Sequence, residues 1–335
     1  MIRIGLLSFW HVHARDYARQ AVEHPDTEIV AAWDENPERG REQAKVYGAR
    51  FHESLDDFLA QSDIDAVIAD APTTMHREVL VKAAQAGKHI FTEKVLAATL
   101  ADCNAIVKAV EESGVKLVVS LRELFNAYPG AIKQIIDDGL LGTVTMIRVR
   151  DAHDGAVPLP DRPDGWLPAH FFNVAETAGG ALIDLGCHPM YLSRFFGGLP
   201  DSVTAHYGHV TGHAVDDNAV AILGYANGAL GIVETAFVSK FSPFSIEISG
   251  TKGSLHCNAR DGQLTLRSTE TSSEWVARDI PAKGPSAFET WVTHIQNGTT
   301  ATENIAQAVD LTRLMEAANR SAAAHTPIRL ADLNG

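Results

Sequence analysis

Cysteine, basic charge and long apolar runs are all scarce in this sequence of 335 residues, and each shortage excludes a class of protein. The three cysteines are widely scattered with no paired spacing, which excludes a disulfide framework and a cysteine-based zinc site: Cys103, Cys187 and Cys257. The 28 Lys and Arg residues against 42 Asp and Glu residues give a formal net charge of −14. A chain this acidic argues against nucleic acid or an anionic membrane as a partner.

The sequence also lacks the segments that direct a protein into or across a membrane. No stretch approaches the roughly 20 apolar residues that span a bilayer. The short apolar run at the N-terminus is interrupted by His11 and no small-residue cleavage site follows it, so we expect no signal peptide. Together with the unpaired cysteines, this favours a reducing cytoplasm as the location.

The length predicts about two domains, which we place at residues 1–122 and 123–335. In the first domain, short apolar runs alternate with helical patterns, which predicts an α/β fold with a parallel, doubly wound sheet. The expected strands are 2–7, 28–33, 66–69, 89–91 and 116–120, and the expected helices are 12–24, 76–86 and 99–113.

The second domain has a different texture, with period-two alternation in residues 144–150 and apolar runs on both sides of Asn227-Gly228. This dipeptide and the later Asp261-Gly262 are hairpin signals, so we expect an α+β domain built on a mainly antiparallel sheet. A last helix is expected over about 302–323, beginning with a capping box at Thr300 and Glu303 and packing back on the first domain.

The turn at residues 8–13 reads Ser-Phe-Trp-His-Val-His, where a phosphate-binding loop would carry glycines. Backbone amides at a helix N-terminus can still hold a diphosphate if the side chains point away, so we expect this turn to bind a dinucleotide. A non-glycine residue held at positive φ here would cost about 1 to 2 kcal/mol. The expected cofactor contacts in the turn are Ser8, Phe9, Trp10, His11 and Val12.

Asp34 lies 21 residues beyond His13, at the end of the second expected strand. An acidic residue at this position can accept hydrogen bonds from an adenosine ribose, which favours NAD over NADP as the cofactor. The alternative is that Asp34 only caps the turn Asp-Glu-Asn-Pro that follows it.

Lys94 follows an expected buried strand, so its ammonium group should project into the crevice beyond the strand ends. There it can hold or polarise a substrate oxygen, and burial can lower its pKa. The alternative is a surface lysine paired with Glu93.

Asp184 and His188 form the candidate acid–base pair of the second domain. A histidine can move a proton near neutral pH, and a carboxylate four residues before it on a helix can set its tautomer. Pro189 indicates instead that the helix proper begins only near His188. In that case both are ordinary polar residues at a helix start.

Taken together, these motifs resemble the Gfo/Idh/MocA oxidoreductases, the family of glucose-fructose oxidoreductase and inositol dehydrogenase. The family's Glu-Lys-Pro reads Glu93-Lys94-Val95 here, and its Thr-Pro-Asn-x-x-His reads as residues 71–76. Its Gly-Gly-x-x-x-Asp-x-Gly-x-His reads as residues 179–188, and the run 125–142 also follows the family's pattern. The resemblance covers nearly the whole chain.

The resemblance implies an N-terminal Rossmann domain, a C-terminal open-faced antiparallel sheet and NAD(P)-dependent oxidation of a sugar or cyclitol hydroxyl. Lys94 and His188 would serve the reacting hydroxyl, with His188 as general base, and Asp184 would orient them. Glu93 would lie near the nicotinamide ribose. Further cofactor contacts are expected at Pro72, Thr73 and His76, and the sheet is expected to form a homodimer or homotetramer.

The sequence departs from the family at the glycine turn, at Val95, and at Leu124, where an arginine is common. The pair His11 and His13 also allows a metal site, since imidazoles are common zinc ligands. We favour a lining around cofactor or substrate instead, and expect no bound metal. Four other residues either line the substrate pocket or are ordinary strand-end and loop residues: Asp151, His153, Trp166 and His170.

The function predicted from the sequence is hydride transfer between nicotinamide and a sugar or polyol hydroxyl. One alternative is a regulator that binds nicotinamide or sugar on the same scaffold without turnover. The damaged turn favours it, whereas the retention of Lys94, Asp184 and His188 opposes it. Another is redox-assisted glycoside hydrolysis or lyase chemistry, which begins with the same hydride transfer.

Overall fold

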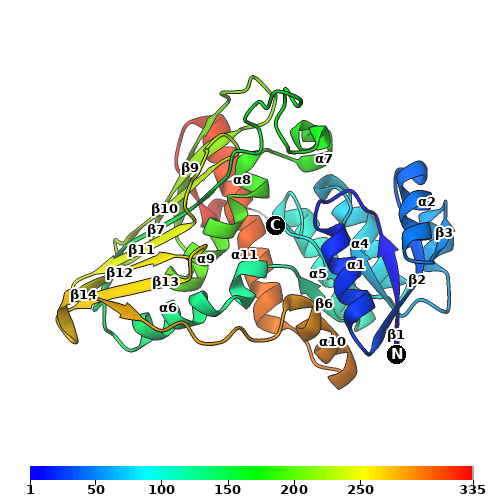
Figure 1. Ribbon diagram of the computed structural model, residues 1–335, viewed down its shortest axis with the longest axis horizontal. Helices are drawn as coiled ribbons and strands as arrows, with labels where there is room; N and C mark the ends of the chain where they lie inside the picture. Colours follow the sequence, from blue (N-terminus) through cyan, green and yellow to red (C-terminus); the bar gives the residue numbers. More distant parts are fainter. Residues whose placement is uncertain (334–335) are drawn as a thin grey trace. The chain divides into compact units, whose positions relative to one another are not determined.

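The computed structural model describes residues 1–333, which group by their contacts into two compact units (Figure 1). The first unit contains Met1–Leu121 and Pro285–Val309, and the second contains Arg122–Gly284 and the chain from Asp310. The sequence placed 285–309 within the second domain, whereas its contacts are with the first unit. No helix within residues 1–333 has both the length and the apolarity that a bilayer crossing requires.

The first unit is built on a six-stranded parallel sheet with the strand order β3-β2-β1-β4-β5-β6. This is the Rossmann order, in which the direction of winding reverses between β1 and β4 and ligands bind beyond the carboxyl ends of the strands. The strands are β1 Ile2–Leu7, β2 Thr27–Trp33, β3 Arg50–His52, β4 Ala66–Ala69, β5 His89–Thr92 and β6 Leu117–Val119.

Helices cover this sheet, which explains why its central strands are apolar throughout. All four residues of β4 are buried, and so is β1 apart from one residue. Close packing also requires a glycine in β1, because a Cβ on Gly5 would lie 2.4 Å from the Phe58 ring. The helices of the unit are α1 Ala14–Glu23, α2 Pro37–Val46, α3 Leu55–Leu59, α4 His76–Gln85, α5 Leu100–Ser113 and α10 Ala287–Asn297.

The five predicted strands and three predicted helices of this unit are confirmed, with their ends shifted by at most two residues. The sequence reading missed α2, β3 and α3. It also missed the capping box that starts α10, formed by Ser286 and Glu289.

The second unit is built on a nine-stranded sheet with the order β14-β13-β12-β11-β7-β10-β9-β8-β15. The expected antiparallel pattern holds except that β7 and β10 run parallel, so the sheet is mixed. Three helices and two strands separate β7 from β10, which gives the chain enough length to return in the same direction. The strands are β7 Val144–Ala152, β8 Ser202–Gly208, β9 Asn218–Gly224, β10 Leu230–Ala236, β11 Ser245–Gly250, β12 Gly253–Asn258, β13 Gln263–Ser268, β14 Ser272–Arg278 and β15 Ile328–Arg329.

One face of this sheet forms the core of the second unit. Its fully buried side chains alternate along the strands and include Val149, Val233 and Ile246. Helix α9 packs against β7 and β10 (Figure 1). The other face carries charged pairs such as Arg148 with Glu234 and is open within this chain. The helices are α6 Ala127–Asp137, α7 Val174–Thr177, α8 Ala181–Asp184, α9 Cys187–Gly197 and α11 Thr302–Ala324.

The last helix lies close to its predicted span of 302–323. Its first residues belong to the first unit, where the Asn304 side chain bonds both backbone groups of Val119 in β6, at 2.8 and 2.9 Å. The side-chain amide therefore pairs with the edge of β6 as another strand would.

Candidate functional site

The turn at residues 8–13 begins with a residue in the left-handed conformation, which costs free energy because that residue is not a glycine. Ser8 has φ of +73° and is buried, in the place where a glycine would be free of strain. Its hydroxyl accepts a hydrogen bond from the Trp10 amide at 3.1 Å, which offsets part of this cost locally. The bulky side chains point into the protein: Phe9 and Trp10 are 8% and 5% exposed, and the Phe9 ring stacks on Tyr47.

The amides of the turn are already paired inside the first unit. The Phe9 amide donates to the Asp34 carboxylate at 2.9 Å, and the His11 amide donates to the Asp70 carbonyl at 3.1 Å. The Trp10 amide holds the Ser8 hydroxyl. A diphosphate can therefore use the Trp10 amide only by displacing that hydroxyl.

Asp34 is fully engaged within the chain. Its two oxygens accept bonds from the amides of Phe9 and Asn36 and from two nitrogens of Arg39, at 2.7 to 2.9 Å. A carboxylate has about four acceptor positions, so Asp34 has none left for a ribose hydroxyl. The neighbouring Glu35 has a buried Oε2 with no hydrogen-bond partner in the described chain, and burial followed by the charge of Asp34 raises its pKa.

Two further acceptors lie at the carboxyl ends of β4 and β5. Asp70 directly follows β4, is 2% exposed, and has an Oδ1 with no hydrogen-bond partner within residues 1–333. Burial, and then the charge of Glu93, hold the pKa of Asp70 well above its usual range. An orphaned buried oxygen at this edge fits a bound ligand with hydroxyl donors, as a nicotinamide dinucleotide has.

Glu93 and Lys94 follow β5 and are 2% and 5% exposed, so Lys94 is not a surface lysine. The Lys94 amide donates to Glu93 Oε2 at 2.7 Å. The other oxygen, Oε1, accepts from the Tyr17 hydroxyl and lies 2.6 Å from His13 Nδ1. Burial opposes ionisation of Glu93, but His11, His13 and Lys94 outweigh it and hold its pKa well below the usual range.

The other residues predicted to contact a cofactor hold the loops after the strands. His76 is 1% exposed, and its two ring nitrogens face the carbonyls of Leu96 and Ala71 at 3.2 and 3.1 Å. Its ring therefore links the loops that follow β4 and β5. Pro72 and Thr73 begin the short 3₁₀ turn Thr73–Met75 that leads into α4.

In the second unit, the Gly-Gly motif is explained by a close approach to Asp216. The Asp216 carboxylate accepts from the amides of Gly180 and Leu182 at 2.9 and 2.8 Å, which caps the start of α8. A Cβ on Gly180 would lie 2.0 Å from the Asp216 carbonyl oxygen, so no other residue fits there. No local sequence pattern pointed to Asp216.

Asp184 and His188 do not share one helix, which confirms the alternative that Pro189 indicated. Asp184 ends α8, and His188 lies in the first turn of α9, which begins at Cys187 as Pro189 indicated. The two residues are thus on separate helices because the chain breaks at Leu185 and Gly186. Asp184 instead acts electrostatically on His153.

Tyr191 holds the His188 ring. His188 is 6% exposed, and its Nδ1 lies 2.8 Å from the Tyr191 hydroxyl, which also accepts from the Glu123 amide at 3.0 Å. The hydroxyl can donate to Nδ1 when the ring is neutral and accept from it when the ring is charged. Tyr191, which sequence reasoning missed, therefore accommodates both protonation states of His188.

Three of the four predicted pocket residues lie around the end of β7. The His153 ring stacks on Phe237 and lies 4.8 Å from the Trp166 ring, centroid to centroid. The Gly155 amide donates to His153 Nδ1 at 3.0 Å, and burial lowers the pKa of the ring. Asp151 pairs with Arg260 at 3.2 Å. The fourth residue, His170, lies in the 3₁₀ turn Ala169–Phe172.

Replacing Asp151 with asparagine is expected to stabilise the protein at neutral pH. Burial raises the Asp151 pKa from 3.8 to about 6, although Arg260 opposes this. Between these values the folded state keeps a proton that the unfolded state has lost, so stability falls as pH rises through this window. The variant should remove that loss, gaining up to about 3 kcal/mol at pH 7.

Urea unfolding of wild type and Asp151→Asn from about pH 4 to pH 7 measures this effect. The exposed Asp161→Asn variant is the matched control and should follow the wild type. Parallel pH profiles for all three proteins would contradict the assignment.

Two sequence models of known protein domains match this chain. A sequence model described as "Oxidoreductase family, NAD-binding Rossmann fold" matches residues 4–121, and one described as "GFO/IDH/MocA C-terminal domain" matches residues 130–256. Together they cover more than two thirds of the chain. The chain belongs to the Gfo/Idh/MocA oxidoreductase family. The resemblance seen in the sequence is thereby confirmed, as are the Rossmann fold and the assignment to NAD-binding oxidoreductases.

The relatives and solved structures that resemble this chain include enzymes named for sugars and a cyclitol. It is 28% identical over 299 residues to 1,5-anhydro-D-fructose reductase of Ensifer adhaerens, covering 87% of this chain and 86% of that one. It is also 28% identical to inositol 2-dehydrogenase of Rhizobium meliloti, with 76% and 74% covered. Levoglucosan dehydrogenase in complex with NADH and L-sorbose shares the fold, with a TM-score of 0.82 at 22% identity, covering 98% and 99%.

Proposed function

We propose that this protein is an NAD-dependent dehydrogenase of a sugar or polyol hydroxyl. The observation that carries the proposal is the buried Lys94 at the carboxyl end of β5, whose backbone amide is held by Glu93 at 2.7 Å. A lysine buried at the ligand-binding edge of a parallel sheet is suited to holding a substrate oxygen. When bound, the nicotinamide ring of the cofactor would accept or donate the hydride.

Lys94 and His188 each have one task in the proposed reaction. Lys94 binds and orients the reacting hydroxyl through its ammonium group. His188 takes the hydroxyl proton, and its Nδ1 contact with Tyr191 stays favourable as the ring becomes charged. Asp184 supplies negative charge to the second unit, where it favours the charged form of His153.

The adenosine end favours NAD over NADP on charge. Arg39 pairs with both Asp34 and Glu35, so the three side chains together carry a net negative charge that opposes a 2′-phosphate. Since Asp34 is saturated, we assign the ribose contact to Glu35, whose Oε2 has no partner in the described chain. Asp70 is the corresponding acceptor beyond β4.

Titration with NAD and NADP tests the proposal. Tryptophan fluorescence should be quenched saturably by NAD, because Trp10 is a buried residue of the turn that we propose binds the dinucleotide. We expect NADP to bind at least about tenfold more weakly, or about 1.4 kcal/mol. Glu35→Gln should weaken NAD binding. Trp10→Phe should remove most of the fluorescence quenching, while the four other tryptophans still give background fluorescence. Absence of binding by either dinucleotide would sink the proposal.

A regulator without turnover is the second candidate, favoured by the internally paired amides of the turn. It predicts sugar or dinucleotide binding with no NADH formed on any sugar or cyclitol. Redox-assisted hydrolysis or lyase chemistry predicts a cleaved or rearranged sugar with no net NADH release. Product analysis beside NADH absorbance separates these outcomes.

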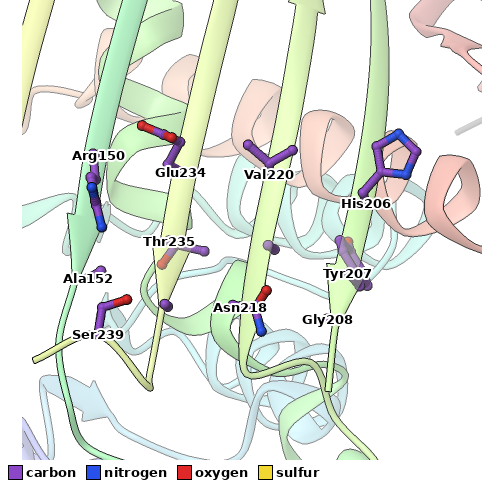
Figure 2. A pocket seen from close by; sticks show the side chains of 12 residues that line it. Arg150, Ala152, His206, Tyr207, Gly208, Asn218, Val220, Glu234, Thr235 and Ser239 are labelled. Carbon is purple, nitrogen blue, oxygen red and sulfur yellow. The ribbon is translucent and has the colours of Figure 1, made fainter. Parts of the chain in front are cut away.

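We further propose that the open face of the second-unit sheet binds a second copy of the chain. It has a hollow of about 380 Å³ at the ends of four strands, lined by Arg150, Asn218 and Glu234 among others (Figure 2). Sedimentation velocity should show a dimer or tetramer; a monomer at micromolar concentration would contradict it.

A further inference from the structure

The sequence predicted a cofactor contact at His11 and no bound metal, yet the rings of His11 and His13 both converge on Glu93. One potential ligand atom from each of the three residues lies within 4.8 Å of the other two. His13 Nδ1 is 2.6 Å and His11 Nδ1 is 3.6 Å from the same oxygen, Glu93 Oε1. All three residues belong to the first unit. We propose that they form a binding site for a divalent transition-metal ion.

The donor set decides the class of ion. Two imidazole nitrogens and one carboxylate oxygen suit Zn²⁺, Fe²⁺ or Co²⁺, whereas Mg²⁺ and Ca²⁺ prefer oxygen ligands alone. Three protein ligands also leave at least one coordination position open, as in catalytic zinc sites.

The three ligands come from rigid supports. The two ring centroids lie 4.7 Å apart on one side of the turn. The His13 amide donates to His11 Nδ1 at 3.2 Å, so an ion that binds this nitrogen must replace that hydrogen bond. Glu93 comes directly after β5, which pairs with a strand on each side in the parallel sheet. A site assembled across a turn and an inner strand needs little ordering when an ion binds.

Outer partners orient the carboxylate. The Tyr17 hydroxyl donates to Glu93 Oε1 and lies 2.7 Å from Ser120 Oγ. Because Tyr17 has one proton, Ser120 is the donor in that second contact. The Lys94 amide fixes Oε2. Hydrogen bonds that orient the ligands in this way are typical of metal sites.

The proposed site is mostly buried but reaches solvent at His13. The side chains of Glu93 and His11 are 2% and 6% exposed, and that of His13 is 20% exposed. In the structure His13 and Glu93 are at hydrogen-bond distance. With metal–ligand bonds of about 2.0 to 2.1 Å, tetrahedral ligand atoms lie about 3.3 Å apart, so the pair must open slightly, and the hydrogen between its two atoms must leave that contact as the ion enters.

The proposed metal site is next to Lys94 in the chain. Lys94 follows Glu93 in sequence, so the ion would lie at the same strand end as the lysine. An open coordination position there can take a water or a hydroxyl oxygen.

Metal titration of the full-length protein without a histidine tag tests the site. The protein is stripped with a chelator and titrated with Co²⁺, read by its visible absorption, and then with Zn²⁺ in competition, with no dinucleotide present. We expect about one ion per chain. His11→Gln and His13→Gln should each weaken binding by at least about 100-fold, and Tyr17→Phe by about 10-fold.

His256→Gln on β12 is the matched control and should bind as the wild type does, because this exposed histidine lies in the second unit. Circular dichroism checks folding, and if one glutamine variant does not fold, the other and Tyr17→Phe decide the result. No saturable Co²⁺ uptake, or equal affinity in wild type and both glutamine variants, would overturn the site and leave a hydrogen-bonded cluster around Glu93. Dinucleotide binding is not the readout, so either proposal can fail alone.

Discussion

Replacing Lys94 with methionine is expected to lower turnover by about three orders of magnitude while dinucleotide affinity changes by less than about threefold. Methionine keeps the length of the buried chain but removes the ammonium that holds the reacting hydroxyl. Steady-state NADH formation on a sugar or cyclitol that the wild type oxidises measures the first effect. Fluorescence titration measures the second.

Lys88 provides the matched control for this variant because it stands at the opposite end of the same strand. It precedes β5 and donates to the carbonyls of Gln61 and Ile64 at 2.7 and 2.8 Å. Lys88→Met should therefore destabilise the fold by about 1 to 3 kcal/mol without altering turnover. Equal turnover in Lys94→Met and wild type would remove Lys94 from the mechanism.

Gly180→Ala is expected to have the largest effect on stability. The added Cβ would lie 2.0 Å from the Asp216 carbonyl oxygen, and backbone cannot yield as a flexible side chain can. We expect a loss of about 3 kcal/mol in the free energy of unfolding, or a displaced α8. Because α8 ends at Asp184, turnover should fall as well.

Gly130→Ala is the control for that substitution. Gly130 lies inside α6, and a Cβ there would meet no atom within 4 Å. The change should raise stability by up to about 1 kcal/mol, since alanine is the better helix former. Urea unfolding measures both variants. The close approach at Asp216 is refuted if Gly180→Ala unfolds at the wild-type midpoint.

Elements of the first unit with strong local signals were predictable. β4 is a short apolar run with both faces buried, and α5 has a threonine cap and ends at Gly114 in the left-handed conformation. α2 was missed although Asn36 caps it and a proline follows, because its face toward the sheet has only two buried residues. The parallel pairing of β7 with β10 has no local signal, since strands distant in sequence become neighbours only when the sheet forms.

The candidate site shows the same division. Lys94 and Glu93 were predictable because strand ends in a parallel sheet meet at one edge. The role of Asp34 was not, because the arginine that fills its oxygens is an ordinary residue of α2. Tyr17 reaches Glu93 across 76 residues of the chain, and Ser120 in turn contacts Tyr17 across 103 residues, so no local motif records either contact.

By itself, the sequence determined the alternation of strands and helices, the family, and the acidic and basic groups that stand at strand ends. Periodicity and turn residues are local properties, and these features depend on nothing more distant. Only the tertiary structure decided that two histidines and a tyrosine share one carboxylate, that Asp216 closes over Gly180, and that Tyr191 holds His188. Those contacts form when packing brings distant side chains into register, and no pattern within a single segment records which partner each will meet.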